Sequence, residues 1–408
     1  MKFLKTISVE EFRKILDSID KLETGGELVN LDEAFNRIIS KDLISNINVP
    51  HFRKSRMDGY AVIAEDTFGA DEDNLIELNL IEIIQAGEIP QKELNHNECS
   101  YVATGAALPE NADAIIMVEF TERKDNKVLI SKAIAPGTHV IEIGHDINKG
   151  DIVVKKGSMV NLATIGILAS CGIKQVPVYA KPKVSLISTG NELLTQNANK
   201  LEIGKIYDVN SIILKKAIEN TGVSVNFLGI VKDIFEDLKK IIDQAIDGSD
   251  IVILSGGTSK GEGDLGPMVL EQYNNIDIFV HGVKIKPGKP IIFVKMGKKI
   301  LFILPGYPTS ALSCFYVFID NFLRRMAGFP LREMFSKEFE VGERIYSTIG
   351  RHEFKTVKIQ EESGKSKIFP IKTGSEAIST IFQSDGYIEI DELEAIIEKG
   401  EIRRVYFF

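Results

Sequence analysis

Residues 183–193 read KVSLISTGNEL, in which a short apolar run leads directly into a turn that contains glycine. The same pattern recurs at residues 250–255, DIVILS, and 299–304, KILFIL. Helical spacing of apolar residues is found between these runs, over residues 211–220 and 234–246. Strands that alternate with helices in this way predict a doubly wound, largely parallel α/β sheet.

Four loops rich in glycine or proline follow predicted strands of this domain. In a doubly wound sheet, ligands bind beyond the carboxyl ends of the strands. Glycine lets backbone amides approach an oxyanion without interference from a Cβ atom, and helix N-termini favour a phosphate. We therefore expect a nucleotide or another phosphorylated ligand at these loops. They read STGNEL (188–193), SGGTSKGEGD (255–264), KPGKP (286–290) and LPGYP (304–308).

The chain on either side of this domain has a different pattern. Residues 1–40 show helical spacing in two segments, with Ser8 as the expected N-cap of the first helix and residues 31–38 as the second. Beyond them, short apolar runs separated by Gly, Pro, Asn and Asp predict small sheets. A helix is expected over residues 161–172. Short alternating runs after residue 331 predict a small all-β domain at the C-terminus.

Charge and cysteine content exclude several classes of protein. With 49 basic and 58 acidic residues the net charge is −9, and the basic residues are scattered, so we expect no nucleic-acid partner. Cys99, Cys171 and Cys314 share no close spacing, which argues against a disulfide framework, a CxxC pair or a zinc site. A reducing, cytoplasmic environment fits these features.

No segment indicates export or a membrane span. The N-terminal MKFLKTISVEEFRKIL carries charges where a signal peptide has its apolar stretch. The uncharged segment 300–319 approaches membrane length, but Pro305, Gly306 and Pro308 divide it. We expect a buried strand, a turn and a helix there, and no contact with a membrane.

Acidic side chains accompany the glycine-rich loops and two further motifs. Hard cations such as Mg²⁺ bind carboxylate oxygens together with substrate phosphates and water, which makes these acids candidate ligands. For each acid alone, the alternative is a solvated loop residue or a helix cap; Asp233 begins a capping-box-like sequence that ends at Glu236. The acids are Asp58 in SRMDGY, Asp146 in GHDI, Glu192 in TGNEL, Asp208 in YDVN, Asp233 and Asp264.

The order of these motifs resembles the molybdopterin molybdenumtransferase family, which includes the bacterial MoeA proteins and the gephyrin E domain. The resemblance covers the whole chain, and several independent motifs occur in one order. The matching segments are SRMDGYAV (55–62), ATGAALPENADAIIM (103–117), LISTGNEL (186–193), IYDVNS (206–211), LSGGTSKGEGD (254–264), KPGKP (286–290) and LPGYPTSA (304–311).

This resemblance implies a multidomain α/β chain that forms a homodimer. A central α/β domain similar to the pterin adenylyltransferases would occupy residues 179–328. A helical and extended linker or dimerisation domain would comprise residues 1–26 and 147–178, a β-rich domain residues 27–146, and a small C-terminal β-barrel residues 329–408. The active site would lie between the central domain of one subunit and the β-rich domain of the other, so activity would require the dimer.

The implied reaction inserts molybdate into adenylylated molybdopterin and releases AMP. A tetrahedral dianion beside an anionic substrate needs amide and hydroxyl donors, cationic groups and a divalent ion, here Mg²⁺. The resemblance assigns catalytic positions to Asp58, Thr104, Asp146, Glu192, Asp233 and Asp264, with Asp58, Glu192 and Asp264 as metal ligands. It assigns substrate binding to Ser255, Gly256, Gly257, Lys286, Lys289, Pro305, Pro308, Ser375 and Arg351.

Four positions depart from the family pattern. Ile141 stands where arginine is frequent, Gly282 where lysine is common, and Tyr307 where the family has the asparagine of LPGNP. Lys284 is near enough in sequence to replace the missing lysine. His145 either binds a metal, shuttles a proton or is a surface replacement. The histidines show no HxxxH or His-Cys grouping, which argues against zinc.

Several alternatives stay open. The chain is compatible with a tungstate-preferring or altered paralogue, with a non-catalytic carrier or scaffold, and with a pterin adenylyltransferase. The retained acids and glycine-rich loops argue against a pure scaffold, because a docking surface needs neither. Ser375 and Arg351 are also compatible with ordinary surface turns. Candidate partners are a pterin adenylyltransferase and the proteins that receive the cofactor.

Overall fold

A computed structural model describes residues 6–258, 265–362, 364–374 and 376–407 of the chain. The chain divides into two compact units, Leu28–Val178 and the remainder, Met1–Glu27 with Tyr179–Phe408. We describe each unit by itself. None of the helices in the described ranges has the length and apolar character that crossing a bilayer requires.

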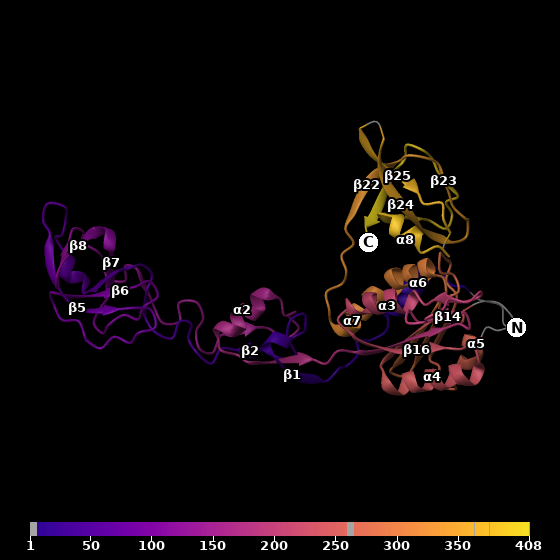
Figure 1. The fold of residues 1–408 in the computed structure, drawn as a ribbon, viewed down its shortest axis with the longest axis horizontal. Coiled ribbons are helices and arrows are strands. Elements are labelled where there is room, and N and C mark those ends of the chain that lie inside the picture. The colour runs from indigo at the N-terminus through magenta and orange to yellow at the C-terminus, as the bar shows by residue number, and fades with distance from the viewer. Residues whose placement is uncertain (1–5, 259–264, 363, 375, 408) are drawn as a thin grey trace. The chain divides into compact units, whose positions relative to one another are not determined.

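The larger unit is built on a six-stranded sheet in the order β16-β13-β17-β21-β20-β18, whose edge strand β16 is labelled in Figure 1. The first four strands are parallel, and the last two run antiparallel to their neighbours. The predicted doubly wound sheet is thereby confirmed, with an antiparallel edge that such sheets often carry. The strands are β13 (Lys183–Thr189), β16 (Ser224–Val231), β17 (Ile251–Ser255), β18 (Ile278–His281), β20 (Ile292–Met296) and β21 (Lys299–Leu304).

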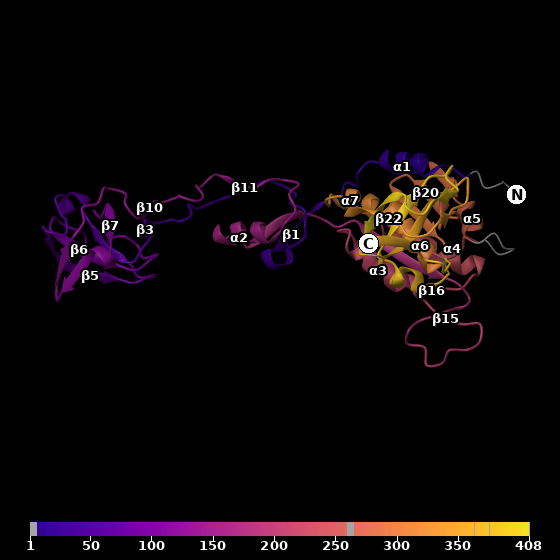
Figure 2. The same ribbon diagram turned by 90° about the horizontal axis from the view of Figure 1, so that it is seen from above.

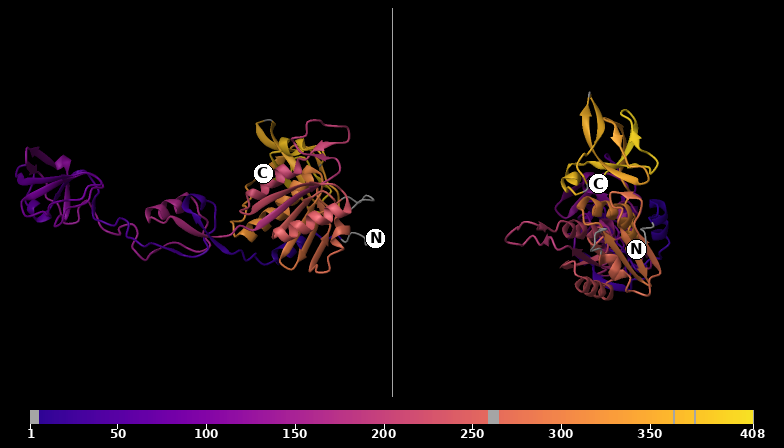
Figure 3. Two further views of the ribbon diagram at one scale, coloured as in Figure 1. Left: turned by 60° about the horizontal axis from the view of Figure 1, so that its bottom comes forward. Right: turned by 90° about the vertical axis from the view of Figure 1, so that its right-hand side faces the viewer.

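Helices cover both faces of this sheet (Figure 3). Ile253 packs in the core on one face and Val252 in the core on the other, which explains why the strands are continuous apolar runs. Four helices share the first core: α1 (Val9–Asp17), α3 (Asn210–Glu219), α6 (Pro308–Cys314) and α7 (Asp320–Ala327). Two share the second: α4 (Phe235–Gly248) and α5 (Leu265–Leu270).

Helix α1 begins as predicted at Ser8. The Ser8 hydroxyl accepts a hydrogen bond from the Glu11 amide, and the Glu11 carboxylate accepts one from the Ser8 amide. Phe12 is fully buried, with its ring centroid 4.8 Å from that of Phe318 and 5.7 Å from that of Phe293. The first helix is therefore part of the core of the central sheet.

The C-terminal strands form the predicted barrel. Their order is β19-β24-β25-β22-β28-β26, and a further pairing of β24 with β26 closes the sheet. The strands are β19 (Ile285–Lys286), β22 (Ser336–Val341), β24 (His352–Glu362), β25 (Lys365–Pro370), β26 (Gly386–Ile390) and β28 (Ile402–Phe407). The pair β23 (Ile345–Tyr346) and β27 (Ile396–Ile397) and the helix α8 (Ser379–Gln383) accompany them.

The unit Leu28–Val178 is rich in strands, as expected. Its main sheet has the order β7-β4-β6-β5-β9-β8, and apolar side chains pack on both of its faces. The strands are β4 (Gly59–Val62), β5 (Ile76–Ile84), β6 (Glu98–Val102), β7 (Ala114–Met117), β8 (Thr121–Lys124) and β9 (Lys127–Ile130). Two-stranded pairings are made by β3 (Lys54–Ser55) with β10 (Val140–Ile141) and by β2 (Leu43–Ile44) with β11 (Ile152–Val154).

A second, smaller core in this unit includes the predicted helix 161–172. The helix α2 (Leu162–Ser170) begins after Asn161, whose side chain accepts from the Thr164 amide. Leu168 packs there with Ile39 and Val178, and β1 (Gly26–Asn30) pairs with β12 (Gln175–Tyr179). The boundaries of the four domains stay a prediction.

The prediction of a second N-terminal helix over residues 31–38 was wrong. Only a single 3₁₀ turn forms, Leu31–Glu33, because Asn36 adopts the left-handed conformation with φ +58°. Of the apolar residues that suggested a helix, Ala34 is fully buried in the small core and Leu31 packs against it, whereas Phe35 is exposed. Helical spacing alone did not distinguish this compact loop from a helix.

Phe12→Ala should lower the free energy of unfolding by about 3–5 kcal/mol, because it removes a buried ring and leaves a cavity. Urea denaturation measures the change. Phe382 is 91% exposed, and Phe382→Ala is the matched control, with an expected effect within about 0.5 kcal/mol. Equal effects of the two substitutions would contradict the packing of α1 on the sheet.

Candidate functional site

The loops after β13, β17 and β21 contact one another at the C-terminal ends of the strands of the central sheet. The Gly256 amide donates to the carbonyl oxygen of Leu304 at 3.0 Å. A Cβ atom on Gly256, whose φ is +104°, would lie 2.4 Å from the Thr189 carbonyl oxygen. Only glycine fits there, which explains the glycine after β17. The structure thus brings Ser255, Gly256 and Gly257 beside the ends of both neighbouring strands.

Asn210, the first residue of α3, joins two of these loops. Its Nδ2 donates to the Ser255 hydroxyl at 2.8 Å and to the Gly306 carbonyl oxygen at 2.7 Å. Asn210 is buried, and its Oδ1 has no hydrogen-bond partner within the described part of the chain. We missed Asn210 in the sequence, although it lies in the quoted segment IYDVNS.

Asp208 binds the first turn of the helix that carries Asn210. Its buried carboxylate accepts from the Ser211 amide at 3.1 Å, through Oδ1. The turn itself follows a long loop between β14 (Leu193–Leu194) and β15 (Ile206–Tyr207), which extends away from the sheet (Figure 2). An acid two residues before a helix was the available signal for this arrangement.

Asp233 serves a different role from the predicted helix cap. The N-cap of α4 is Ile234, and its side chain makes no capping hydrogen bond. The Asp233 carboxylate instead accepts from the Thr189 hydroxyl at 2.5 Å, and its amide donates to Asn191 Oδ1 at 3.2 Å. The capping interpretation was therefore wrong. Asp233 and the exposed Glu192 belong to adjacent loops, after β16 and β13.

The KPGKP loop packs on α6, the helix that follows LPGYP. A Cβ atom on Gly288, with φ +112°, would lie 2.4 Å from Cys314 Sγ. Pro305 is buried, and Pro308 is the first residue of α6. Among the predicted substrate-binding residues, Lys286, Lys289 and Arg351 are partly exposed here.

The barrel reaches the same region from the other side of this loop. The Lys286 ammonium lies 3.1 Å from Glu353 Oε2 and 3.1 Å from Thr348 Oγ1. The Thr309 hydroxyl donates to the Ala377 carbonyl oxygen at 3.3 Å. Arg351 directly precedes β24. Lys286 is thus shared between the central domain and the barrel.

In the unit Leu28–Val178, Asp58 and Thr104 form a pair. Asp58 Oδ1 accepts from the Thr104 amide at 2.6 Å and from its hydroxyl at 2.9 Å. These two hydrogen bonds, above all the one from the Thr104 amide, hold the pKa of the Asp58 carboxyl below its usual value. Asp146 is exposed in a turn of the same unit, and its amide donates to the Val49 carbonyl oxygen at 3.0 Å.

Asp58, Thr104 and Asp146 thus belong to one unit, and the strand-end residues to the other. Asp264 and Ser375 lie outside the described residues. Within the described ranges, no group of three His, Cys, Asp or Glu side chains is arranged to hold a metal ion. The metal ligands Asp58, Glu192 and Asp264 accordingly stay a prediction.

The positions that depart from the family pattern make contacts that are common in folded proteins. Gly282 is buried with φ +92°, a conformation that lysine rarely adopts. Lys284 Nζ lies 3.9 Å from Glu392 Oε2. Ile141 pairs with Lys54 between β10 and β3, and His145 is exposed. Tyr307 is 59% exposed and directly follows Gly306, whose carbonyl oxygen accepts from Asn210.

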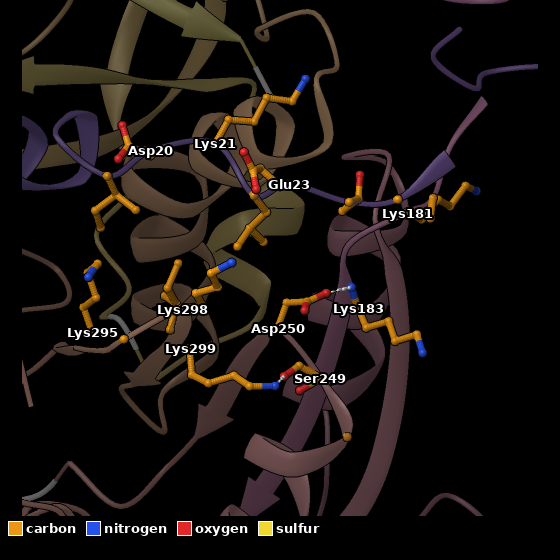
Figure 4. A pocket seen from close by; sticks show the side chains of 18 of the residues that line it. Asp20, Lys21, Glu23, Lys181, Lys183, Ser249, Asp250, Lys295, Lys298 and Lys299 are labelled. Carbon is orange, nitrogen blue, oxygen red and sulfur yellow. Dashed lines mark hydrogen bonds between the residues drawn. The ribbon is translucent and has the colours of Figure 1, made fainter. Parts of the chain in front are cut away.

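A cavity of about 780 Å³ lies at the opposite edge of the sheet, near the start of β13 and β21. Figure 4 shows that its lysine side chains point in different directions. Lys299 Nζ donates to the Ser249 carbonyl oxygen at 2.6 Å, and Asp250 accepts from the Lys183 amide at 2.8 Å. Four acids lie among the six lysines of the lining, so the cavity carries both signs of charge. The glycine-rich edge is the better candidate.

Comparison with known proteins agrees with this arrangement. Residues 7–172 match the MoeA N-terminal region (domain I and II), residues 185–325 a probable molybdopterin binding domain, and residues 339–408 the MoeA C-terminal region (domain IV). A Methanocaldococcus jannaschii protein named for molybdopterin biosynthesis is 38% identical over 414 residues, 99% of this chain and 97% of that protein. The chain belongs to the MoeA family.

Other MoeA relatives extend the comparison. The molybdopterin molybdenumtransferase of Haemophilus influenzae is 36% identical over 306 residues, 75% of this chain and 74% of that protein. The crystal structure of a molybdopterin biosynthesis MoeA protein from Pyrococcus horikoshii is 37% identical, with a TM-score of 0.83 and 99% of both chains covered. The resemblance and the fold class inferred from the sequence are confirmed.

Asp58 should titrate below its ordinary value of 3.8, because both hydrogen bonds from Thr104 favour the carboxylate. A depressed pKa means that these bonds contribute to stability at neutral pH and that the contribution is lost as the pH falls through the folded-state pKa. Carboxyl ¹³C NMR measures the midpoint. Thr104→Val removes the hydroxyl donor and keeps the amide donor, so it should raise the Asp58 midpoint in part. The control Thr121→Val should leave the Asp58 midpoint unchanged. A midpoint at or above 3.8 in the parent protein would contradict this pairing.

Asn210→Ala should reduce the free energy of unfolding by about 1–3 kcal/mol, since the buried Ser255 hydroxyl and the Gly306 carbonyl oxygen lose their donor. Asn210→Asp should also lower the free energy of unfolding, because a carboxylate cannot donate to the Gly306 carbonyl oxygen. Guanidinium denaturation measures both variants. Asn226 is exposed on β16, and Asn226→Ala should be nearly neutral. Full stability of Asn210→Asp would show that the bridge is not needed.

Proposed function

We propose that this chain is a molybdopterin molybdenumtransferase of molybdenum cofactor biosynthesis. It transfers molybdenum from molybdate to adenylylated molybdopterin, and water hydrolyses the phosphoanhydride, which leaves a phosphate on the pterin and releases AMP. The observation that carries this proposal is the joining of three glycine- or proline-containing loops by Gly256 and Asn210 at one edge of the sheet. Family membership supports the transferase and its pathway.

Each part of the strand-end site suits one part of this substrate. The Gly257 amide and the Ser255 hydroxyl suit a nucleotide phosphate, because the glycines of this loop permit close approach. Lys286, Lys289 and Arg351 supply positive charge for molybdate, with Pro305 and Pro308 shaping the loop beside them. A fixed arrangement of such donors and cations stabilises charge that develops as the anhydride breaks.

We also propose that Mg²⁺ accompanies the nucleotide. Mg²⁺ is usually held by one or two carboxylates together with substrate phosphates and water. Glu192 and Asp233, on adjacent loops, fit such a partial ligand set. The proposed metal ligands also include Asp58 and Asp264, as the family resemblance implies. The ion would neutralise phosphate charge when bound.

The proposed active form is a cytoplasmic homodimer. Asp58 and Thr104 of one subunit would serve the strand-end site of its partner, with Asp146 in the same β-rich region. In this arrangement the Asp58–Thr104 pair would bring an ordered carboxylate, which stays ionised at neutral pH, to the partner's site. A pterin adenylyltransferase would supply the substrate, and cofactor-receiving proteins would accept the product.

The test follows AMP release from purified protein with adenylylated molybdopterin, graded molybdate and graded Mg²⁺. Asp58→Asn should lower kcat/KM by roughly 10²-fold, because a positioned charge is lost without a change of size. Glu122→Gln, on an exposed acid of the same unit, is the matched control and should be neutral.

Two outcomes would reject the proposal. AMP release that is independent of any oxyanion would exclude insertion as the reaction. Tight binding of the substrate without AMP release, with molybdate or tungstate, would show that the chain is a carrier. A strong preference for tungstate would instead retain the reaction and change its oxyanion.

A further inference from the structure

Glu353 is a buried carboxylate at the contact between the barrel and the KPGKP loop. It is 3% exposed. Its Oε2 accepts from the Ser347 hydroxyl at 2.7 Å and from Lys286 Nζ at 3.1 Å, and its Oε1 lies 3.9 Å from Lys355 Nζ. A buried carboxylate is tolerated only when it is paired and hydrogen-bonded. Lys286 is therefore one of the partners that satisfy the buried Glu353 carboxyl group.

The backbone reinforces this pair. Strand β19 runs parallel to β24, with Lys286 opposite Glu353 and Ile285 opposite His352. The His352 amide also donates to the Lys284 carbonyl oxygen at 2.9 Å. Backbone pairing thus sets the separation between the main chains of Lys286 and Glu353, from which the two side chains meet.

Lys286 retains capacity for a ligand in this arrangement. An ammonium group has three donors, and the contacts with Glu353 and Thr348 use two of them. Its side chain is 37% exposed, against 4% for that of Glu353. A lysine side chain loses much rotamer freedom when it is immobilised by a ligand, so prior ordering reduces that loss.

We propose that Glu353 is a positioning residue for the oxyanion substrate. It touches no ligand; it orders Lys286 so that the third ammonium donor is directed to molybdate. This inference rests on the proposed function, because it takes the oxyanion at Lys286 from there. Arg351, two residues before Glu353 in sequence, adds positive charge to the same segment.

Two substitutions separate position from charge. Glu353→Asp keeps the charge but shortens the side chain, so the carboxylate withdraws from Lys286. Glu353→Gln keeps the length and an acceptor oxygen but removes the charge. Positioning predicts that Glu353→Asp raises the KM and the Kd for molybdate about tenfold, with little change in kcat, whereas Glu353→Gln stays near the parent values.

The measurements are AMP release for KM and kcat, and equilibrium dialysis with molybdate for Kd. Glu338→Asp, which shortens an exposed acid paired with Arg404 on the same barrel, is the control. Thr348→Val removes the second partner of Lys286 at an exposed position, and should raise Kd without unfolding the barrel. In a Lys286→Met background, Glu353→Asp should have no further effect on Kd.

The outcomes are distinct. If Glu353→Asp kept the parent KM and Kd for molybdate while Glu353→Gln changed them, the positioning role would be overturned in favour of an effect of charge. A lower Tm for both variants with unchanged Kd would reduce Glu353 to a structural role and reject the proposal, as would parent protein that binds no molybdate. Parent protein that binds molybdate without releasing AMP, with the Kd pattern intact, would reject the proposed reaction and leave the positioning role supported.

Discussion

The close approach of Gly256 to the Thr189 carbonyl oxygen is the contact on which the strand-end site depends. A Cβ atom at Gly256 would lie 2.4 Å from that oxygen, so the loop after β17 can take this path only with glycine. The path places the Gly256 amide on the Leu304 carbonyl oxygen and Ser255 within reach of Asn210. Asn210 in turn holds Gly306 in the loop after β21. Three loops far apart in sequence are thereby set at one sheet edge.

A second close contact extends the site toward the barrel. Gly288 leaves no room for a Cβ atom beside Cys314, so the KPGKP loop lies directly on α6. The barrel meets this loop through β19 and β24 and through the buried Glu353. Burying this carboxylate is favourable only with its partners in place. The position of Lys286 is consequently linked to the packing of two domains.

The Asp58–Thr104 pair shows a different principle. Two hydrogen bonds from one residue to one carboxylate oxygen order this pair within the β-rich unit. They favour the charged form, so the carboxylate remains an acceptor at any neutral pH. Such a carboxylate suits a role in orienting water or a cation and does not suit proton donation. The chemistry expected of Asp58 in the proposed reaction agrees with this.

The sequence by itself determined the alternation of strands and helices, the strand-rich flanking regions and the membership of a family. These follow from local hydrophobic periodicity and from glycine-rich motifs, both of which are set by residues close together in sequence. Only the tertiary structure decided that residues 31–38 form a compact loop, that Asp233 accepts from Thr189 rather than capping α4, and that Asn210 and Glu353 join separate segments. Hydrogen bonds between residues distant in sequence leave no periodic trace, because they depend on where the folded chain brings each side chain.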